Sequence, residues 1–265
     1  MSEVRFDSLG YDPTLLRRRS PWWGVHAARY HDAVQYVAGC RVLDVACGTG
    51  YGLPVLKSRA RLVVGVDLEF EAASKALALS GTDDGEVIVA DGSELPFMDG
   101  SFEVVTSFET LEHLKNRKEF LSEVRRVLIA SGLCIISTPN ANYTRPIDGK
   151  PRNPHHIYEY TPEELTAELN RYFADIDLFG QVLDSRFVIS PFIDDQERLS
   201  HTIRTQARLL LWRAFNKMPA VVRDELSQAV WGHPLFPGEA DYQFTHETVE
   251  VAPVLYALCQ KIKSK

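Results

Sequence analysis

Two clusters of acidic and histidine side chains stand where the sequence changes from apolar to polar. Glu109, Glu112 and His113 follow an apolar run, and His155 and His156 follow a segment rich in Pro, Asn and Gly. If a helix begins at Glu109, the spacing of i, i+3 and i+4 places the first three on one face. Two carboxylates and one imidazole form three corners of a metal site, and the second cluster can supply a fourth ligand. Alternatively, the glutamates stabilise a helix N-terminus and His113 packs nearby.

A glycine turn carries a second group of polar residues. In LDVACGTG, Gly48 and Gly50 lie between an apolar run and a helical segment. Glycine at such a turn lets the backbone approach a ligand closely. Asp67 ends the next apolar run, where a carboxylate can accept both hydroxyls of a ribose, and Asp91 ends the third, placed to meet an adenine edge. The turn lacks the last glycine of a dinucleotide fingerprint and the lysine of a P-loop, which disfavours both.

The elements that must position these residues alternate between strands and helices. Apolar runs predict strands over 41–46, 61–68, 86–90, 102–108, 133–138, 175–182 and 253–260. Helical patterns and caps cover 20–39, the segment from the glycine turn to 60, 69–80, 117–130, 161–173, 199–216 and 221–231. The start of the helix predicted over 161–173 is sharply defined, because Thr161 and Glu164 form a capping box. The alternation predicts an α/β fold with a mostly parallel sheet covered by helices on both faces.

Composition and charge narrow the class of protein. The chain has 265 residues, 45% of them apolar, which is enough for one sizeable core. Its net charge of −7 argues against a nucleic-acid partner. We see no apolar leader and no stretch of the ~20 residues that a membrane span needs. The four cysteines contain no C-x-x-C pair, so we expect a reduced, cytoplasmic protein.

Four motifs in this order and spacing resemble the class I S-adenosylmethionine-dependent methyltransferases. They are VLDVACGTGYG, GVDLE, ADGSELPF and FEVVTSFETLEHL, and the resemblance covers residues 26 to about 183. It implies a Rossmann-like sheet of seven strands with the last one antiparallel. It also implies a methyltransferase domain over 21–265 after a polar segment, 1–20. A helical insert at about 190–233 interrupts the alternation, and we expect a lid or an association surface there.

The same resemblance implies how S-adenosylmethionine is bound. Gly48 and Gly50 would pass under the methionine part of the cofactor. The other implied residues are Asp67 with Leu68 at the ribose, Asp91 with Gly92 or Ser93 around the adenine, Phe108 in the pocket wall and Asp44 at the family's strand-end acidic position. Arg29 is similar to an arginine that meets the methionine carboxylate in ubiquinone-type O-methyltransferases. The alternative for Arg29 is an arginine on the solvent face of a helix.

The two histidine clusters carry a narrower resemblance. E-x-x-E-H followed by H-x-x-E-[YW]-T resembles the terminal-ribose 2′-O-methyltransferases of small RNAs, in which these side chains hold magnesium against a vicinal diol. It implies Glu109, Glu112, His113 and His156 as metal ligands. His113, His155 and His156 are then the candidate catalytic groups, with His155 as a possible base. Magnesium is the expected metal, and manganese is compatible with the same ligands.

These residues predict an S-adenosylmethionine-dependent O-methyltransferase acting on a hydroxyl of a sugar, glycan or glycosylated metabolite. The segments HAARY, STPN and NPHHIYEYTPEEL are similar to bacterial methyltransferases of polysaccharide and glycan pathways. Alternatives are a terminal-ribose RNA methyltransferase, a quinone or phenol O-methyltransferase, and a cofactor-binding scaffold subunit without catalysis. The expected partner is a small-molecule or oligosaccharide acceptor, and the apolar stripe of helices 199–231 could form a homodimer.

Overall fold

The chain folds into two compact units in a computed structural model that describes residues 20–80, 86–187 and 202–261. The described part of the larger unit comprises residues 29–80, 86–182 and 244–261. The smaller unit comprises 20–28, 183–187 and 202–243 among the described residues. The predicted polar segment 1–20, except for Ser20, and the part of the predicted insert over 190–201 lie outside the described residues.

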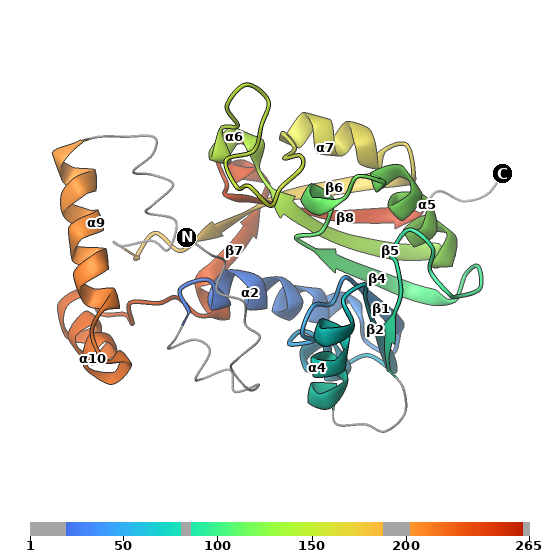
Figure 1. Cartoon of the computed structure of the whole chain (residues 1–265), viewed down its shortest axis with the longest axis horizontal. Coiled ribbons are helices and arrows are strands. Elements are labelled where there is room, and N and C mark those ends of the chain that lie inside the picture. Colours follow the sequence, from blue (N-terminus) through green and yellow to red (C-terminus); the bar gives the residue numbers. More distant parts are fainter. Residues whose placement is uncertain (1–19, 81–85, 188–201, 262–265) are drawn as a thin grey trace. The chain divides into compact units, whose positions relative to one another are not determined.

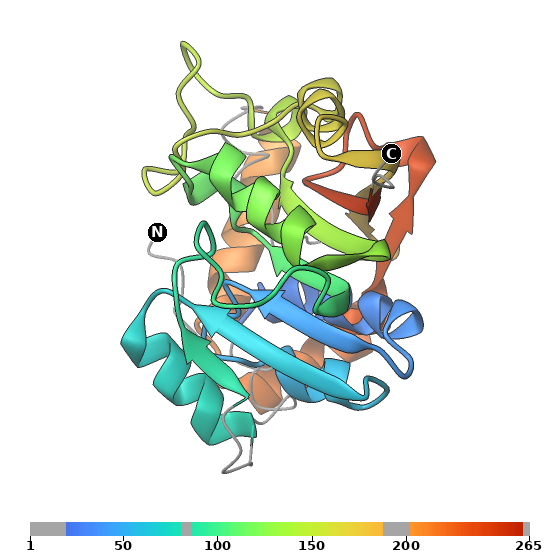
Figure 2. The same ribbon diagram turned by 90° about the vertical axis from the view of Figure 1, so that its right-hand side faces the viewer.

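An eight-stranded sheet has the strand order β3-β2-β1-β4-β5-β8-β6-β7. The strands are β1 (Arg41–Val45), β2 (Leu62–Asp67), β3 (Val87–Val89), β4 (Phe102–Phe108), β5 (Leu128–Pro139), β6 (Phe173–Leu183), β7 (Tyr242–Thr245) and β8 (Val254–Lys261). β1 to β5 pair in parallel, whereas β8 is antiparallel to both β5 and β6. Figure 2 shows the parallel strands side by side. The predicted α/β sheet with an antiparallel last strand is confirmed.

The prediction of seven strands is wrong by one. The additional strand is β7, four residues long, at the edge of the sheet beside β6. The segment YQFT does alternate between aromatic and polar residues, but its four residues are the shortest run in which such alternation indicates a strand. The seven predicted strands are all present, with ends that differ by a few residues from those expected.

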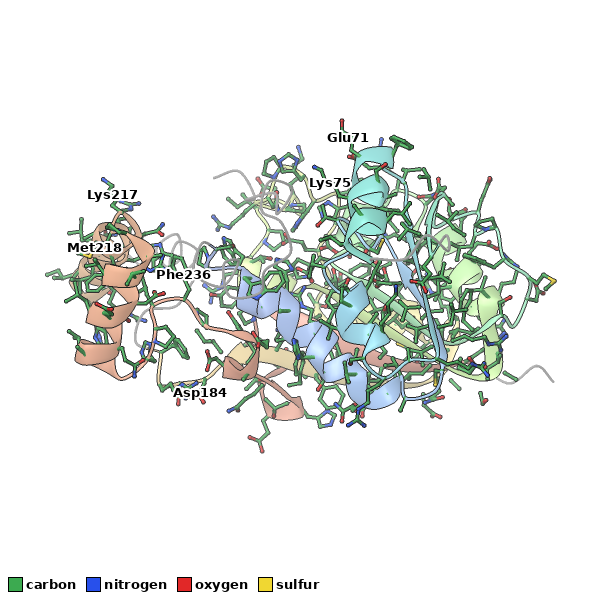
Figure 3. The ribbon with its side chains drawn as sticks, turned by 90° about the horizontal axis from the view of Figure 1, so that it is seen from below. Glu71, Lys75, Asp184, Lys217, Met218 and Phe236 are labelled. Atoms are coloured by element: carbon green, nitrogen blue, oxygen red, sulfur yellow. The ribbon has the colours of Figure 1, made fainter. Side chains whose placement is uncertain are left out.

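Helices connect the strands. They are α2 (Trp23–Ala33), α3 (Leu53–Lys57), α4 (Phe70–Ser80), α5 (Arg117–Val127), α6 (Ala141–Thr144), α7 (Pro162–Leu169), α9 (Ile203–Asn216) and α10 (Ala220–Trp231), with 3-10 turns η2 (Val34–Tyr36), η3 (Leu111–His113), η4 (Glu239–Asp241) and η5 (His246–Thr248). The predicted capping box is confirmed, because the Thr161 hydroxyl accepts from Glu164 N and the Glu164 carboxylate accepts from Thr161 N. Glu71 projects from the first turn of α4 (Figure 3).

Both faces of the sheet in the larger unit are covered by apolar packing. Consecutive residues of β1 belong to different cores, with Val42 on one side and Leu43 on the other, as a pleated strand requires. The Leu43 side includes residues of α5 and α7, and the Val42 side includes residues of α2, α3 and α4. Figure 1 shows α5 and α7 on one side of the sheet and α4 on the other. This double cover explains why the strands read as continuous apolar runs.

The smaller unit has its own apolar core, in which Trp212 of α9 packs on Phe236 with ring centroids 5.4 Å apart. On α9, Leu210 and Leu211 of the predicted apolar stripe are exposed, whereas Leu209 and Trp212 are buried. In the sequence, α9 and α10 come after β6 and before β7, where the helical insert was predicted. Within the described ranges, we find no helix long and apolar enough to cross a membrane.

Candidate functional site

Parallel strands bring their carboxyl ends to one edge of the sheet, and the predicted site residues follow those ends. Val45 pairs with Val66 across β1 and β2, and Asp44 pairs with Thr106 across β1 and β4. The glycine turn after β1, Asp67 at the end of β2 and Glu109 after β4 are therefore neighbours at this edge. In open α/β sheets this is where ligands bind.

The turn after β1 requires glycine at two positions for different reasons. Gly48 and Gly50 have φ values of 57° and 78°, in the left-handed region that side chains disfavour. A Cβ on Gly50 would lie 2.5 Å from the Cβ of Ala76, so this glycine lets the turn pack closely on α4. A Cβ on Gly48 would have no neighbour within 4 Å, so the backbone there is open to a ligand. Ala46 also has a positive φ, 60°, without being glycine.

Asp67 fixes the turn by hydrogen bonding. Its Oδ2 accepts from Gly48 N at 2.8 Å and its Oδ1 from Glu69 N at 2.9 Å. Each carboxylate oxygen can accept more than one hydrogen bond, so both keep acceptor capacity for hydroxyl donors. Leu68, the next residue, is 66% exposed and offers apolar surface beside this carboxylate.

Asp44 lies beneath the turn and is fully buried. Its Oδ1 accepts from Thr106 Oγ1 at 2.7 Å and its Oδ2 from Tyr30 Oη at 3.0 Å. Burial raises the pKa of Asp44 to about 7, although both hydrogen bonds oppose the shift. The protein therefore supplies a donor to each oxygen of this carboxyl group, and Asp44 holds the strands and α2 together below the cofactor position expected from the sequence.

The segment after β3 places a polar turn at the same edge. Asp91 Oδ1 accepts from Ser93 N at 2.8 Å and from Ser93 Oγ at 2.7 Å, and Gly92 lies between them. These hydrogen bonds lower the pKa of Asp91. Asn116 Nδ2 donates to Ser93 Oγ at 2.7 Å, which ties the turn to the start of α5. Asp91 thus remains ionised and oriented at neutral pH.

Arg29 is buried, with 1% of its side chain exposed. Its Nε donates to Gln181 Oε1 at 2.8 Å, and its Nη1 lies 3.3 Å from Glu109 Oε1. The alternative of a solvent-facing helix arginine is therefore wrong. Phe108, at the end of β4, is also buried, with its ring 4.8 Å from that of Tyr30.

The segment Glu109–His113 is not a helix, so the expectation of three side chains on one helical face is wrong. Glu109 has a left-handed φ of 53°, and only a 3-10 turn, η3, follows. The Glu109 carboxylate accepts from Ser137 Oγ at 2.9 Å and pairs with Arg29. The left-handed residue turns its side chain out of the series that a continuous helix would give.

Glu112 is fully buried and only half satisfied. Its Oε2 accepts from Thr138 Oγ1 at 2.9 Å, whereas its Oε1 has no hydrogen-bond partner among the described residues. Burial, and then the negative charge of Glu109, raise the pKa of Glu112 well above its ordinary value. The backbone carbonyl of the same residue accepts from Ile157 N at 2.7 Å and from Tyr158 N, which joins the loop after β5 to η3.

Hydrogen bonds fix the tautomers of two neighbouring histidines. His113 Nδ1 lies 3.0 Å from the His155 carbonyl, and His156 Nδ1 lies 2.7 Å from Glu159 Oε1. Since both partners are acceptors, each Nδ1 carries a proton, and in the neutral ring each Nε2 then carries the lone pair. Asn153 Nδ2 donates to His156 Nε2 at 2.8 Å, and the two imidazole rings have centroids 4.9 Å apart.

Three of the four predicted metal ligands come together. One ligand atom each of Glu112, His113 and His156 lies within 4.8 Å of the others, and Glu112 Oε1 is 3.9 Å from His113 Nε2. This donor set of a carboxylate oxygen and two imidazole nitrogens suits a divalent cation, and the unpartnered Oε1 would gain a partner in it. Glu109 is not in this group. The His155 side chain is exposed, and its backbone carbonyl contacts His113.

Sequence reasoning missed the residues that orient this cluster. Glu159, Asn153 and Thr138 each donate to or accept from one of the clustered side chains. Glu159 left a signal, because it stands three residues after His156 within the H-x-x-E pattern. Asn153 and Thr138 left none, since single polar residues in a loop and at a strand end are common.

The chain is similar to known methyltransferases. Residues 43–136 match the family model described as "Methyltransferase domain". The chain is 35% identical over 160 residues to a Mycobacterium tuberculosis protein named "probable S-adenosylmethionine-dependent methyltransferase", covering 60% of this chain and 58% of that protein. It is 37% identical over 123 residues to the demethylmenaquinone methyltransferase of Clavibacter sepedonicus, covering 44% and 48%.

The matched part spans less than two thirds of the length of either relative. Among solved structures, the fold is similar to that of a SAM-dependent methyltransferase from Archaeoglobus fulgidus, with a TM-score of 0.54 at 19% identity, covering 94% of this chain and 98% of that one. At that identity the structural likeness concerns the fold alone.

Proposed function

We propose that the chain, in which residues 43–136 match the model of a methyltransferase domain, is a class I S-adenosylmethionine-dependent O-methyltransferase. In this proposal a methyl group passes from the sulfonium of S-adenosylmethionine to a hydroxyl of a sugar, glycan or glycosylated metabolite. The products are S-adenosylhomocysteine and a methyl ether, and the hydroxyl proton leaves to a base. Glu112, His113 and His156 would hold a divalent cation, which would supply positive charge at the acceptor hydroxyl.

The glycine-turn edge fits the cofactor. Gly48 leaves open space above the backbone, and Asp67 keeps acceptor capacity for the ribose hydroxyls. Asp91, with Gly92 and Ser93, would meet the adenine, and Leu68 would cover part of the ligand. The buried Arg29 would meet the methionine carboxylate, and Phe108 would line the pocket.

The observation that carries the O-methylation proposal is that one ligand atom each of Glu112, His113 and His156 lies within 4.8 Å of the others, while Glu112 Oε1 has no hydrogen-bond partner among the described residues. A bound divalent cation supplies a positive charge that lowers the pKa of an alcohol and anchors a neighbouring hydroxyl. His113 and His156 would orient that cation through their Nε2 lone pairs. Methyl transfer is an in-line displacement, so catalysis here depends mainly on alignment.

The metal is proposed as magnesium or manganese. The resemblance stated above favours magnesium, whereas two imidazoles in the donor set make manganese equally acceptable to these residues. Glu109 enters this proposal differently from the sequence-based expectation. Its carboxylate already binds Arg29 and Ser137. We therefore place Glu109 between the proposed cofactor site and the proposed cation, and not among the ligands of the cation.

The second candidate is a quinone or phenol O-methyltransferase. It is favoured by the similarity to a demethylmenaquinone methyltransferase and by the exposed apolar residues of α9 and α10, such as Leu210 and Val230. The same exposed residues support our proposal of a homodimer through these helices. A terminal-ribose RNA methyltransferase is disfavoured by the net charge of −7, and a scaffold role by the assembled histidine cluster. A cytoplasmic location stays a prediction.

An acceptor screen tests the proposal. Purified protein is incubated with S-adenosylmethionine and sugars, nucleoside diphosphate sugars, hydroquinones or short RNAs, and S-adenosylhomocysteine is measured. We expect turnover with a polyol acceptor, loss of turnover with excess chelator, and recovery with Mg²⁺ or Mn²⁺. Turnover of a hydroquinone that persists in chelator would support the second candidate, and turnover of a polyol in chelator would overturn the role of the cation.

A further inference from the structure

We propose that Glu159 is a positioning residue for His156, which holds the imidazole in the one tautomer and orientation that present Nε2 to a divalent cation. This inference rests on the proposed function for the presence of the cation. The Glu159 side chain is buried, and its Oε1 accepts from the His156 ring. Its effect on function is therefore exerted through His156.

The contacts of Glu159 are those of a carboxylate built into the site. Oε1 accepts from His156 Nδ1 at 2.7 Å, and Oε2 accepts from the Thr144 hydroxyl. The side chain of Glu159 is 1% exposed and that of His156 9%. Thr144 belongs to α6, and Tyr160, the residue after Glu159, accepts from Ala141 N with its carbonyl oxygen at 2.8 Å. The carboxylate is thus anchored independently of the histidine.

Asn153 gives independent evidence for the same tautomer. Its Oδ1 accepts from His155 N at 3.0 Å, which determines that the other end of the amide, Nδ2, faces His156. Nδ2 is a donor, so the atom that it meets, His156 Nε2, must be an acceptor. The two sides of the ring therefore agree. A cation at Nε2 would take the place of this Asn153 hydrogen bond.

Glu159 also makes the two histidines of the cluster unequal. His113 Nδ1 donates to a neutral backbone carbonyl, whereas His156 Nδ1 donates to a carboxylate. A carboxylate partner makes the opposite ring nitrogen a more basic metal ligand than a carbonyl partner does, and it fixes the ring orientation more firmly. We therefore assign His156 as the stronger imidazole ligand of the pair, with Glu159 as the cause.

Mn²⁺ binding to the full chain with S-adenosylhomocysteine present, followed by electron paramagnetic resonance, tests this assignment. Glu159→Gln keeps the size of the side chain and an acceptor for Nδ1 but removes the charge. We expect Mn²⁺ affinity to fall roughly 10- to 100-fold, the usual cost of losing such a partner, with S-adenosylhomocysteine affinity unchanged. Glu164→Gln is the matched control, because it removes the same charge from a cap five residues later, and its Mn²⁺ affinity should equal that of the wild type.

Wild-type Mn²⁺ affinity in Glu159→Gln would overturn the inference. If the wild type itself binds no Mn²⁺, the cation part of the proposed function fails instead. The tautomer then decides on Glu159 separately, by ¹⁵N NMR of the metal-free wild type with His156→Gln for assignment. Protonation of His156 on Nδ1 supports the positioning role, and protonation on Nε2 excludes it.

Discussion

Two fully buried carboxyl groups, Asp44 and Glu112, lie at the same edge of the sheet. They differ in the hydrogen-bond donors that the protein supplies to their oxygens. Asp44 receives one hydroxyl donor on each oxygen, from Thr106 and Tyr30. Glu112 receives a donor from Thr138 on one oxygen only, and its other oxygen has no partner in the described part of the chain. Burial raises the pKa of both groups.

The difference separates a structural carboxyl from one that is prepared for a ligand. Burying an acceptor without a partner costs about 1–3 kcal/mol, so such groups persist where a bound species supplies the missing partner. The neighbouring histidines offer Glu112 Oε1 no donor while their rings are neutral, since His113 and His156 carry the ring proton on Nδ1. The protein satisfies both oxygens of Asp44, whereas Glu112 Oε1 would gain a partner from a proton or from the proposed cation.

The largest expected effect concerns the cation. Glu112→Ala should abolish detectable Mn²⁺ binding, because it removes the buried anionic ligand and leaves two neutral imidazoles. Asp44→Asn should leave Mn²⁺ affinity within about twofold of the wild type, since Asp44 is satisfied by the protein and is not among the clustered ligands. Both are measured by electron paramagnetic resonance. Equal loss in the two variants would remove the distinction between the two carboxyls.

The cofactor side should respond to a different residue. Asp67→Ala removes the acceptor that fixes Gly48 and would bind the ribose, so S-adenosylhomocysteine affinity should fall roughly 100-fold by calorimetry. Mn²⁺ affinity should not change. The control is Glu71→Ala, which removes an exposed carboxylate from the first turn of α4 and should keep cofactor affinity. Unchanged affinity in Asp67→Ala would exclude this residue from the cofactor site.

The free energy of unfolding should fall as pH rises, because the pKa values of both Asp44 and Glu112 are raised in the folded protein. A raised native pKa means that the folded protein binds more protons than the unfolded chain, so the free energy of unfolding falls as pH rises. For Asp44 the window runs from its ordinary value of 3.8 to about 7, and for Glu112 it begins at 4.5. In chelator at pH 8, Glu112→Gln should therefore gain roughly 1–3 kcal/mol, with little gain at pH 4.

Urea denaturation with and without Mn²⁺ separates the effect of the buried Glu112 charge on stability from the effect of the cation. Mn²⁺ should stabilise the wild type at pH 8 and leave Glu112→Gln largely unaffected, because ligand binding adds stability only where the site exists. A Glu112→Gln variant less stable than the wild type in chelator at pH 8 would show that the buried carboxylate is satisfied by the protein.

The smallest expected effect concerns backbone strain beside each carboxyl. Ala46, two residues after Asp44, and Glu109, three before Glu112, both have positive φ without being glycine. Ala46→Gly should raise the free energy of unfolding by about 0.5–1 kcal/mol, because a Cβ is strained at this positive φ. The methyl group of Ala46 is exposed, so its removal costs no packing. Glu109→Gly should lower it by roughly 1–3 kcal/mol despite the relieved strain, since buried Arg29 loses a charged partner. Urea denaturation measures both, and a destabilised Ala46→Gly would contradict the strain.

The sequence by itself determined the sheet and the cofactor edge. Apolar runs alternating with helical patterns require parallel strands, and parallel strands bring Gly48, Asp67 and Asp91 to one edge whatever the details of packing. The capping box at Thr161 and Glu164 is likewise local, because its partners are three residues apart. Contacts of this kind are settled by neighbours along the chain, so reading the chain is sufficient.

Only the tertiary structure decided how the two histidine clusters meet. The i, i+3, i+4 rule needs a continuous helix after β4, and none forms: Leu111 is buried in the core, and the loop after β5 donates Ile157 N and Tyr158 N to the Glu112 carbonyl. Glu109 then turns toward Arg29, which precedes it by eighty residues. Glu112, His113 and His156 are brought together by hydrogen bonds from segments distant in sequence, and residue spacing carries no information about such partners.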